Sequence, residues 1–497
     1  MLNSTAALNF IRDAYPEEGA CRLNFRELQD WPGLHFVASS VVSINFACNA
    51  FSVFDSSIAQ MFHIHTIQVP HNRFRCIPSI LRKMPFLTSV DFSFNNIQEV
   101  DFTLFPKHIE LVRVSNCGVQ RVVLQHLPEL KELQVKVHEL TILKLGENFP
   151  KLLELNLNSG PLIHLELNSS TSSLRRIFAS ANCMALIPRS IFNCKALEVL
   201  DLTDNKLSNI DYDIGVVDSL TDFRCEGNPL SVGLYACLEM GWLGGLKELF
   251  KILYHTVNSR VLNLNSIRGL KSLPTEMLDN CSDVLEMVAV EVGLQNLEGI
   301  IKRCLVLRSL NVAQNSLSGM STTGSAYKFH PTITYLNVSS CSLSGIPWNL
   351  TGASLETLDI SDNKLNTIDD EKLLGLRSLR TLMMRSCGLK TLGDYFIHLT
   401  QLEVLDISKN QIANIAKALM MMPQLFELKF SGNPSVNPPP EIARLDENAG
   451  IKYLKKLQQS METNTLDLSG SKLRYIPHGK FASFALVPAC SNLLAYT

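Results

Sequence analysis

An eleven-residue pattern recurs along most of this 497-residue chain and constrains its fold more than any other feature. Apolar residues occupy positions 1, 4, 6 and 11 of the pattern, and asparagine occupies position 9. The clearest copy consists of Leu197, Leu200, Leu202, Asn205 and Leu207. Within two long series of copies, the first positions lie 21 to 26 residues apart, so the chain repeats one short structural unit many times.

The spacing of the apolar positions predicts the structure of each copy. Positions 4 and 6 flank an outward residue at position 5, which is the two-residue period of a short β-strand. One such strand every ~20 to 29 residues is the period of leucine-rich repeats. We therefore expect an α/β leucine-rich-repeat solenoid. It would be a curved horseshoe with a parallel β-sheet on its concave face and loops and short helices on its convex face.

The side chain at position 9 is predicted to form a structural ladder. An inward asparagine amide can bind backbone groups that the turning chain leaves unpaired, and cysteine, a small weak donor, is the usual substitute. Because His138, Gly160 and Val292 interrupt the pattern, we expect a strained ladder near residues 138–160. The predicted ladder residues are Asn49, Asn72, Asn95, Cys117, Asn182, Asn205, Asn228, Asn315, Cys341, Asn363, Cys387, Asn410 and Asn433.

A longer period groups the repeats into blocks. Similar openings occur at residues 23–32, 262–274 and 466–477, and Gly-Asn-Pro closures occur at 227–229 and 432–434. A packed closing helix is expected after the first closure, because apolar residues recur at helical spacing. These residues are Leu243, Leu246, Leu249, Phe250 and Leu253.

This block pattern predicts four segments. They are an N-terminal helical cap at 1–20, a first block with its closing helical segment at 21–258, a second at 259–460, and the start of a third at 461–497. The third block ends after one weak repeat, without the polar cap that usually closes a solenoid. We therefore expect either a truncated gene product or isoform, or a partner that covers this end.

The repeats resemble those of the intracellular, typical-class leucine-rich-repeat proteins. Three segments carry the resemblance, which covers nearly the whole chain. They are the opening Leu-Asp-Leu-Ser-Gly at 466–470, the entry repeat Val-Val-Ser-Ile-Asn-Phe at 41–46, and the Lys-rich closing helix with Tyr-Leu-Lys-Lys at 453–456. The resemblance implies a cytosolic interaction protein without catalysis, and it supplies no binding residues to transfer.

Composition narrows the classes of partner. The 45 basic and 47 acidic residues give a net charge of −2, which argues against a nucleic-acid partner and against a polybasic membrane anchor. No apolar stretch approaches the ~18 residues of a membrane span, and residues 1–20 do not form a signal peptide. The 13 scattered cysteines fit a reducing compartment. We expect a cytoplasmic protein without membrane insertion.

No motif predicts catalysis. The chain contains no phosphate loop, no HExxH and no GxSxG, so we expect no catalytic, cofactor-binding or metal-binding residues. His63, His65 and His71 could bind zinc if their rings converged, but surface histidines beside a strand are the favoured interpretation. Trp31 and Trp242 could anchor an interface, although core packing is favoured.

The concave face is the predicted binding surface, because a solenoid builds an extended face there. Charges alternate from repeat to repeat in the second block, where an ordinary solvated face is the competing interpretation. The candidate contacts are Asp359, Asp362, Arg380, Arg385 and Asp406. We expect a non-enzymatic scaffold for a protein partner. The alternatives are a regulatory or targeting subunit of a phosphatase or small-GTPase pathway, and a fragment of a longer protein that has a C-terminal catalytic domain.

Overall fold

The structure is a computed structural model, and it describes residues 19–469 apart from short gaps. The described residues form two compact units. The first runs to Val232 and includes 242–251, and the second consists of 233–241 and the residues from Ile252 onward. The gaps are at 30, 32–40, 138, 168–172, 322–326, 347, 351–352, 369–372, 374, 394–395, 397, 415–418, 420–421, 435–437, 439–441, 443–444, 446–447, 464 and 466.

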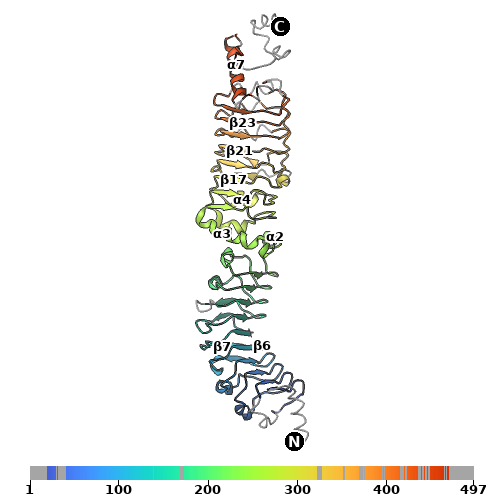
Figure 1. The fold of residues 1–497 in the computed structure, drawn as a ribbon, viewed down its shortest axis with the longest axis vertical. Coiled ribbons are helices and arrows are strands. Elements are labelled where there is room, and N and C mark those ends of the chain that lie inside the picture. Colours follow the sequence, from blue (N-terminus) through green and yellow to red (C-terminus); the bar gives the residue numbers. More distant parts are fainter. Residues whose placement is uncertain are drawn as a thin grey trace. The chain divides into compact units, whose positions relative to one another are not determined.

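A ten-stranded parallel sheet runs through the first unit, with its strands stacked as successive rungs (Figure 1). Each strand of this sheet pairs with that of the next repeat, because every repeat returns the chain to the same side. Leu200, for example, lies opposite Ile177 on one side and Phe223 on the other. The strands are β1 (Ala20–Arg22), β2 (Ser43–Asn45), β3 (Thr66–Gln68), β4 (Ser89–Asp91), β6 (Leu111–Val119), β8 (Glu132–Val137), β10 (Glu154–Asn156), β12 (Arg176–Phe178), β13 (Val199–Asp201) and β14 (Asp222–Arg224).

The segments that return the chain between these strands are of two kinds. Most contain a short 3₁₀ helix: η2 (Ser56–Gln60), η3 (Ser79–Lys83), η4 (Phe102–Leu104), η6 (Arg189–Asn193) and η7 (Tyr212–Val216). In the middle of the unit they also form two extra parallel pairs, β5 (Glu99–Asp101) with β7 (Arg121–Val123), and β9 (Ile142–Lys144) with β11 (His164–Glu166). The sequence predicted only loops and short helices on this side, so these strand pairs are a difference from the expectation.

The second unit contains an eight-stranded parallel sheet of the same kind. Its strands are β15 (Val261–Asn263), β16 (Glu286–Val288), β17 (Ser309–Asn311), β19 (Tyr335–Asn337), β21 (Thr357–Asp359), β22 (Thr381–Met383), β23 (Val404–Asp406) and β24 (Glu427–Lys429). The return segments include η9 (Thr275–Cys281), α4 (Glu298–Arg303), η10 (Leu317–Ser321) and the pair β18 (Tyr327–Lys328) with β20 (Trp348–Asn349). Helix α7 (Ala449–Thr463) follows the last strand.

The core of both units consists of the apolar positions of the repeat. Leu200, Leu202 and Leu207 are each 1% exposed or less. Position 8 of the repeat adopts a left-handed backbone even where it is not glycine, as at Asp204 with φ of 52°. Such a residue is held there only because the surrounding turn is over-determined by its packing and hydrogen bonds. The repeats therefore form a leucine-rich-repeat solenoid.

The first sheet is followed by α2 (Val232–Leu238), a π-helical turn η8 (Trp242–Leu246) and α3 (Lys247–Ser259). Leu249 and Phe250 of α3 are 1% exposed or less, as the helical spacing predicted. Gly215 permits this packing, since a Cβ atom there would lie 2.4 Å from the backbone nitrogen of Lys251. Leu243, by contrast, lies before α3 and is 73% exposed, so its place in the packed stripe was predicted wrongly.

Two predicted segments fall largely outside the described residues. Of the helical cap at 1–20, only Gly19 and Ala20 are described, and Ala20 is the first residue of β1 rather than helical. The third block at 461–497 is described only as far as Ser469. There the Ser469 N–H donates to Asp467 at 2.8 Å, a turn like that after strands of the two sheets.

Candidate functional site

The candidate contacts lie on or next to three successive strands of the second unit: Asp359 and Asp406 end β21 and β23, Arg380 precedes β22, and Asp362 and Arg385 follow β21 and β22. We call the side of each sheet that carries positions 3 and 5 of the repeats its concave face. Asp359 and Asp406 both occupy position 5, and Met383 lies between them, paired with Asp359 on β21 and with Asp406 on β23. All three side chains are half-buried. The parallel register therefore places the two carboxylates in one column with an apolar side chain between them.

The carboxylates of Asp359 and Asp406 also have a structural role. One oxygen of each accepts the backbone N–H two residues later, from Ser361 and Ser408, at 2.9 Å in both cases. Asp201 of the first unit binds Thr203 in the same way at 3.0 Å. This contact fixes the backbone where it leaves the strand, as Asp and Asn side chains commonly do in turns. The charges at position 5 therefore shape the turn as well as the surface.

The other three candidates differ in how far their charges are satisfied. Arg380 forms an ion pair with Glu403 of the next repeat. Asp362 is exposed at position 8, where φ is 55°, and its backbone N–H donates to the Arg385 carbonyl at 2.7 Å. Within the described part of the chain, the side chains of Asp362, Arg385 and Lys409 have no ion-pair partner. These three exposed charges are the ones most available to a ligand.

The position-9 asparagines share one set of hydrogen bonds. Asn205, which is 2% exposed, donates from Nδ2 to the carbonyl of Ala179 in the preceding repeat at 2.9 Å and to that of Leu202 at 3.1 Å. Its Oδ1 accepts the N–H of Met184 at 3.1 Å. The same donor and acceptor contacts to the preceding repeat occur at Asn49, Asn72, Asn95, Asn182, Asn228, Asn315, Asn363, Asn410 and Asn433.

Cysteine at position 9 makes a reduced version of these contacts. The Sγ atom of each donates to a carbonyl of the preceding repeat: Cys117 to Phe92 and Cys341 to Val312 at 3.1 Å, and Cys387 to Ile360 at 3.2 Å. Burial raises the pKa of Cys341 and Cys387 to about 11, so both are neutral thiols at neutral pH. The pKa of Cys117 is also raised by burial. These positions hold the backbone and are poor nucleophiles.

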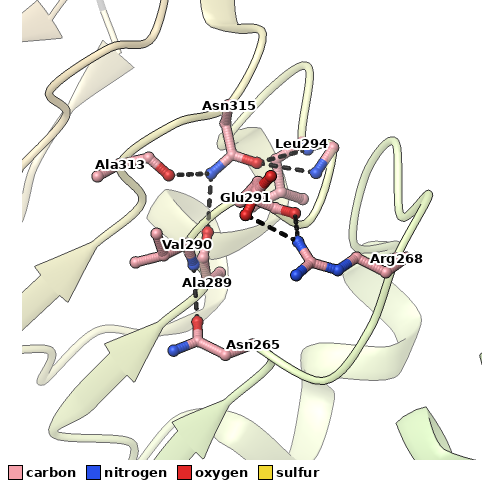
Figure 2. Close-up of polar contacts among 9 residues, drawn as sticks. Asn265, Arg268, Ala289, Val290, Glu291, Leu294, Ala313 and Asn315 are labelled. Atoms are coloured by element: carbon pink, nitrogen blue, oxygen red, sulfur yellow. Dashed lines mark hydrogen bonds and ion pairs between the residues drawn. The ribbon is translucent and has the colours of Figure 1, made fainter.

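The interruption at Val292 is bridged by other side chains (Figure 2). Asn315 still reaches back to the carbonyl of Ala289 at 2.7 Å, but the apolar side chain of Val292 cannot bond to the repeat before it. Instead, Asn265 accepts the N–H of Val290 at 2.8 Å. Arg268 donates to the carbonyl of Glu291 and forms an ion pair with its carboxylate at 3.3 Å. The sequence pattern did not reveal these substitutes.

The interruptions in the first unit differ from one another. His138 lies outside the described residues. Gly160 lines a small hollow of about 190 Å³ with Leu143, Leu157 and Asn182 among its neighbours. Near it, Asn158 accepts the N–H of Ser180 in the following repeat at 2.8 Å. This contact joins the Gly160 repeat to the following repeat, where the contacts of Asn182 are intact, so it does not replace the contacts that an asparagine at position 160 would make to the preceding repeat.

The histidines considered for zinc contact aromatic rings. His63 and His65 both stack on Phe86, with ring centroids 6.0 and 5.8 Å apart, and His71 stacks on Phe94 at 4.1 Å. The Nδ1 of His65 lies 2.8 Å from the His63 carbonyl. In the part of the chain that the structure describes, no three His, Cys, Asp or Glu side chains are grouped so that they could hold a metal ion.

The tryptophan at the start of the first unit packs in the aromatic core. Trp31 lies 4.9 Å from Phe46 and 5.4 Å from Phe51, measured between ring centroids. Phe54 contacts it as well, at 5.2 Å. The side chain of Trp242 is outside what the structure describes. The exposed rings of Phe62 and Phe86 were missed by the sequence reasoning, although their place one or two residues before a repeat begins could have indicated them.

Comparisons with known proteins match part of the chain to a leucine-rich-repeat family model. The family model described as Leucine rich repeat matches residues 331–389, which include β19, β21 and β22. Podocan-like protein 1 of Mus musculus is 23% identical over 394 residues, which cover 72% of this chain and 67% of that protein.

Solved structures with similarity include the functional domain of InlJ from Listeria monocytogenes. It is 15% identical, with a TM-score of 0.37, over 82% of this chain and 72% of that one. Another is the leucine-rich-repeat protein LIC12759 of Leptospira interrogans, 17% identical with a TM-score of 0.31, over 92% and 97% of the two chains. Among the described residues, no helix is long and apolar enough to cross a membrane. Leucine-rich repeats generally mediate contacts between proteins.

Proposed function

We propose that this chain is a non-enzymatic, cytoplasmic scaffold that binds a protein partner through the concave face of its second unit. The observation that carries the proposal is the group of exposed charges at Asp362, Arg385 and Lys409, which have no ion-pair partner among the described residues and border the column of Asp359 and Asp406. Charges arranged in this way select a partner and speed its association, since a complementary surface is attracted before contact. Met383 supplies apolar area between them.

The cytoplasmic location is supported by the cysteines. Every cysteine in the described residues has a free thiol, and most of these thiols are buried, as expected in a reducing compartment. A block pattern with Gly-Asn-Pro closures also resembles leucine-rich-repeat-containing protein 40, and we extend the proposal to a cytosolic interaction protein of that type. We expect no nucleic-acid partner, because the net charge of the chain is near zero.

A pull-down with quantitative mass spectrometry tests the proposal. The bait variant is Asp362→Lys with Arg385→Glu, which reverses two exposed charges without changing the net charge or the position-5 turn contacts. The matched control is Asp283→Lys with Arg377→Glu, two exposed residues that precede the β16 and β22 repeats, whereas Asp362 and Arg385 follow strands β21 and β22. We expect a partner retained by wild type and control to be reduced about tenfold with the bait variant, as for loss of an interface hot spot.

Equal capture by all three proteins would exclude this face from partner binding. The captured proteins also decide between the scaffold and its alternative. A phosphatase or small GTPase lost only with the bait variant would indicate a regulatory or targeting subunit. Circular dichroism of each variant confirms that the sheets are intact before the capture is interpreted.

A further inference from the structure

An apolar groove in the first unit lies between η2 and η3, on the segments that return the chain between strands. It holds about 440 Å³ of open space. We call it the η2–η3 groove, and its lining is apolar except for one lysine. The lining residues are Ile58, Ala59, Met61, Phe62, Ile80, Lys83, Met84 and Pro85.

Two large aromatic side chains are exposed at this groove and beside it. Phe62, which lines it, is 60% exposed, and Phe86, next to the lining residue Pro85, is 48% exposed. Phe86 is held in place because His63 and His65 stack on its ring. Fixed, exposed aromatic rings beside an apolar hollow are typical of interaction sites, since they bury area without losing much side-chain freedom on binding.

Two exposed cations lie at one end of the groove. Residues 56–90 contain no Asp or Glu, whereas Arg82 and Lys83 occupy the last turn of η3 and are exposed. Neither cation has an ion-pair partner in the described ranges of the chain. In the middle of the same unit, by contrast, Lys131 pairs with Glu110 at 2.8 Å and Lys151 with Glu129 at 2.7 Å. The groove therefore combines apolar surface with two exposed cations at the end of η3, and the carboxylate of Asp55 precedes η2.

We propose that the η2–η3 groove binds an acidic amphipathic peptide segment of a partner protein. A leucine or aromatic side chain of the segment occupies the hollow beside Phe62, and its carboxylates lie against Arg82 and Lys83. Helix-in-groove recognition uses this combination of apolar anchors and flanking charge. A peptide fits better than a bilayer surface because the apolar side chains enclose a hollow that a discrete side chain can fill.

This groove is separate from the surface of the proposed function, which lies on another unit and on the strands. The test is a selection of random 16-residue peptides displayed on phage against the full chain. Two variants are compared with wild type, Phe62→Ser and Lys83→Glu, both at exposed positions. Leu186→Ser and Lys206→Glu are matched controls in the same unit, since Leu186 is 71% exposed and Lys206 is also exposed.

We expect the selected peptides to be rich in Asp and Glu around a leucine or aromatic residue. A fluorescein-labelled copy of the most enriched peptide should bind wild type and both controls alike. Its affinity should fall about tenfold with Phe62→Ser and with Lys83→Glu, as for residues at the centre of a small interface. The Lys83→Glu loss should shrink as salt is added.

Three outcomes would overturn the proposal. One is selection of basic or uncharged peptides, or of none. Another is peptides whose affinity is unchanged in both variants. The third is sedimentation of the chain with phosphatidylserine vesicles that Phe62→Ser abolishes, which would assign the patch to a membrane surface instead. Because the proposed function is tested with charge variants of the second unit, either proposal can fail without the other.

Discussion

The repeats at residues 174–228 and those at 109–160 share one sheet but complete their turns differently. The first set has an asparagine at each position 9, and its strands are three residues long. The second set has Cys117 and Gly160 at that position, and β6 and β8 extend to nine and six residues. Their register also shifts between Val114 and Val119.

The amide at position 9 pairs with backbone groups where the chain leaves the strand. Backbone N–H and C=O groups at the end of each strand must find partners once they are buried. In the regular repeats, Asn205 and its equivalents provide them, so the strand can end at once. The strands β6 and β8 stay paired for longer, and the return segments form the extra pairs β5–β7 and β9–β11. By contrast, β10, β16, β19 and β22 remain three residues long, although their repeats also lack asparagine at position 9.

The largest expected effect is a difference in alkylation rate between the exposed thiols and the cysteines at position 9. Cys76 and Cys183 are exposed, whereas Cys387 is buried with its pKa raised from 9.0 to about 11. At pH 8 the higher pKa alone lowers the thiolate fraction about a hundredfold. Iodoacetamide labelling followed by peptide mass spectrometry should therefore modify Cys76 and Cys183 first. Equal labelling of Cys387 in the folded chain would contradict its assignment as a buried residue of the position-9 ladder.

Removing the position-9 asparagine of one regular repeat should give the next largest effect, a loss of stability. Asn205→Ala deletes an amide with contacts to Ala179, Leu202 and Met184, and it leaves buried backbone groups unpaired. We expect the free energy of unfolding to fall by about 3 kcal/mol. Cys387→Ala, which removes one weak S–H donor, should lower it by about 1 kcal/mol. Urea denaturation followed by circular dichroism measures both, and equal losses would mean that the amide contributes no more than the thiol.

Placing an asparagine at an interrupted position 9 is expected to stabilise the repeats at residues 109–160. Gly160→Asn places an amide beside the hollow of about 190 Å³ and reduces the freedom of the unfolded chain. The free energy of unfolding should rise by about 0.5 to 1 kcal/mol. A clear loss in the same urea titration would show that the extended strands of this region no longer have room for the regular turn.

The last pair of variants tests the turn contact at position 5. Asp359→Ala removes the acceptor for the Ser361 N–H and should lower the free energy of unfolding by about 1 kcal/mol. Asp359→Asn keeps an acceptor oxygen at the same place and should change stability by less than about 0.5 kcal/mol. Thermal melts of both variants check this. If both were equally destabilised, the negative charge rather than the hydrogen bond would hold the turn.

Much of this fold could be predicted because the core residues occupy fixed positions in every repeat. Positions such as Leu200 and Leu202 are buried as the two-residue period indicates. The candidate contacts could be placed on one face by the same period, but their partners could not. The pairing of Arg380 with Glu403 depends on which rotamers the neighbouring repeat leaves open, and the exposure of Phe62 and Phe86 depends on how η2 and η3 pack.

The sequence by itself determined the repeat, the apolar core positions and the residues at position 9, because each repeat can bury its apolar residues only by stacking on its neighbours. Only the tertiary structure decided how the turns close. It holds Phe94 and Asp204 in a left-handed backbone at φ of 57° and 52°, a conformation that is uncommon for residues other than glycine and rare for a bulky aromatic residue. It also recruits Asn265 and Arg268 where Val292 leaves the ladder incomplete. These contacts depend on how neighbouring repeats pack, so they cannot be predicted from the sequence pattern of one repeat.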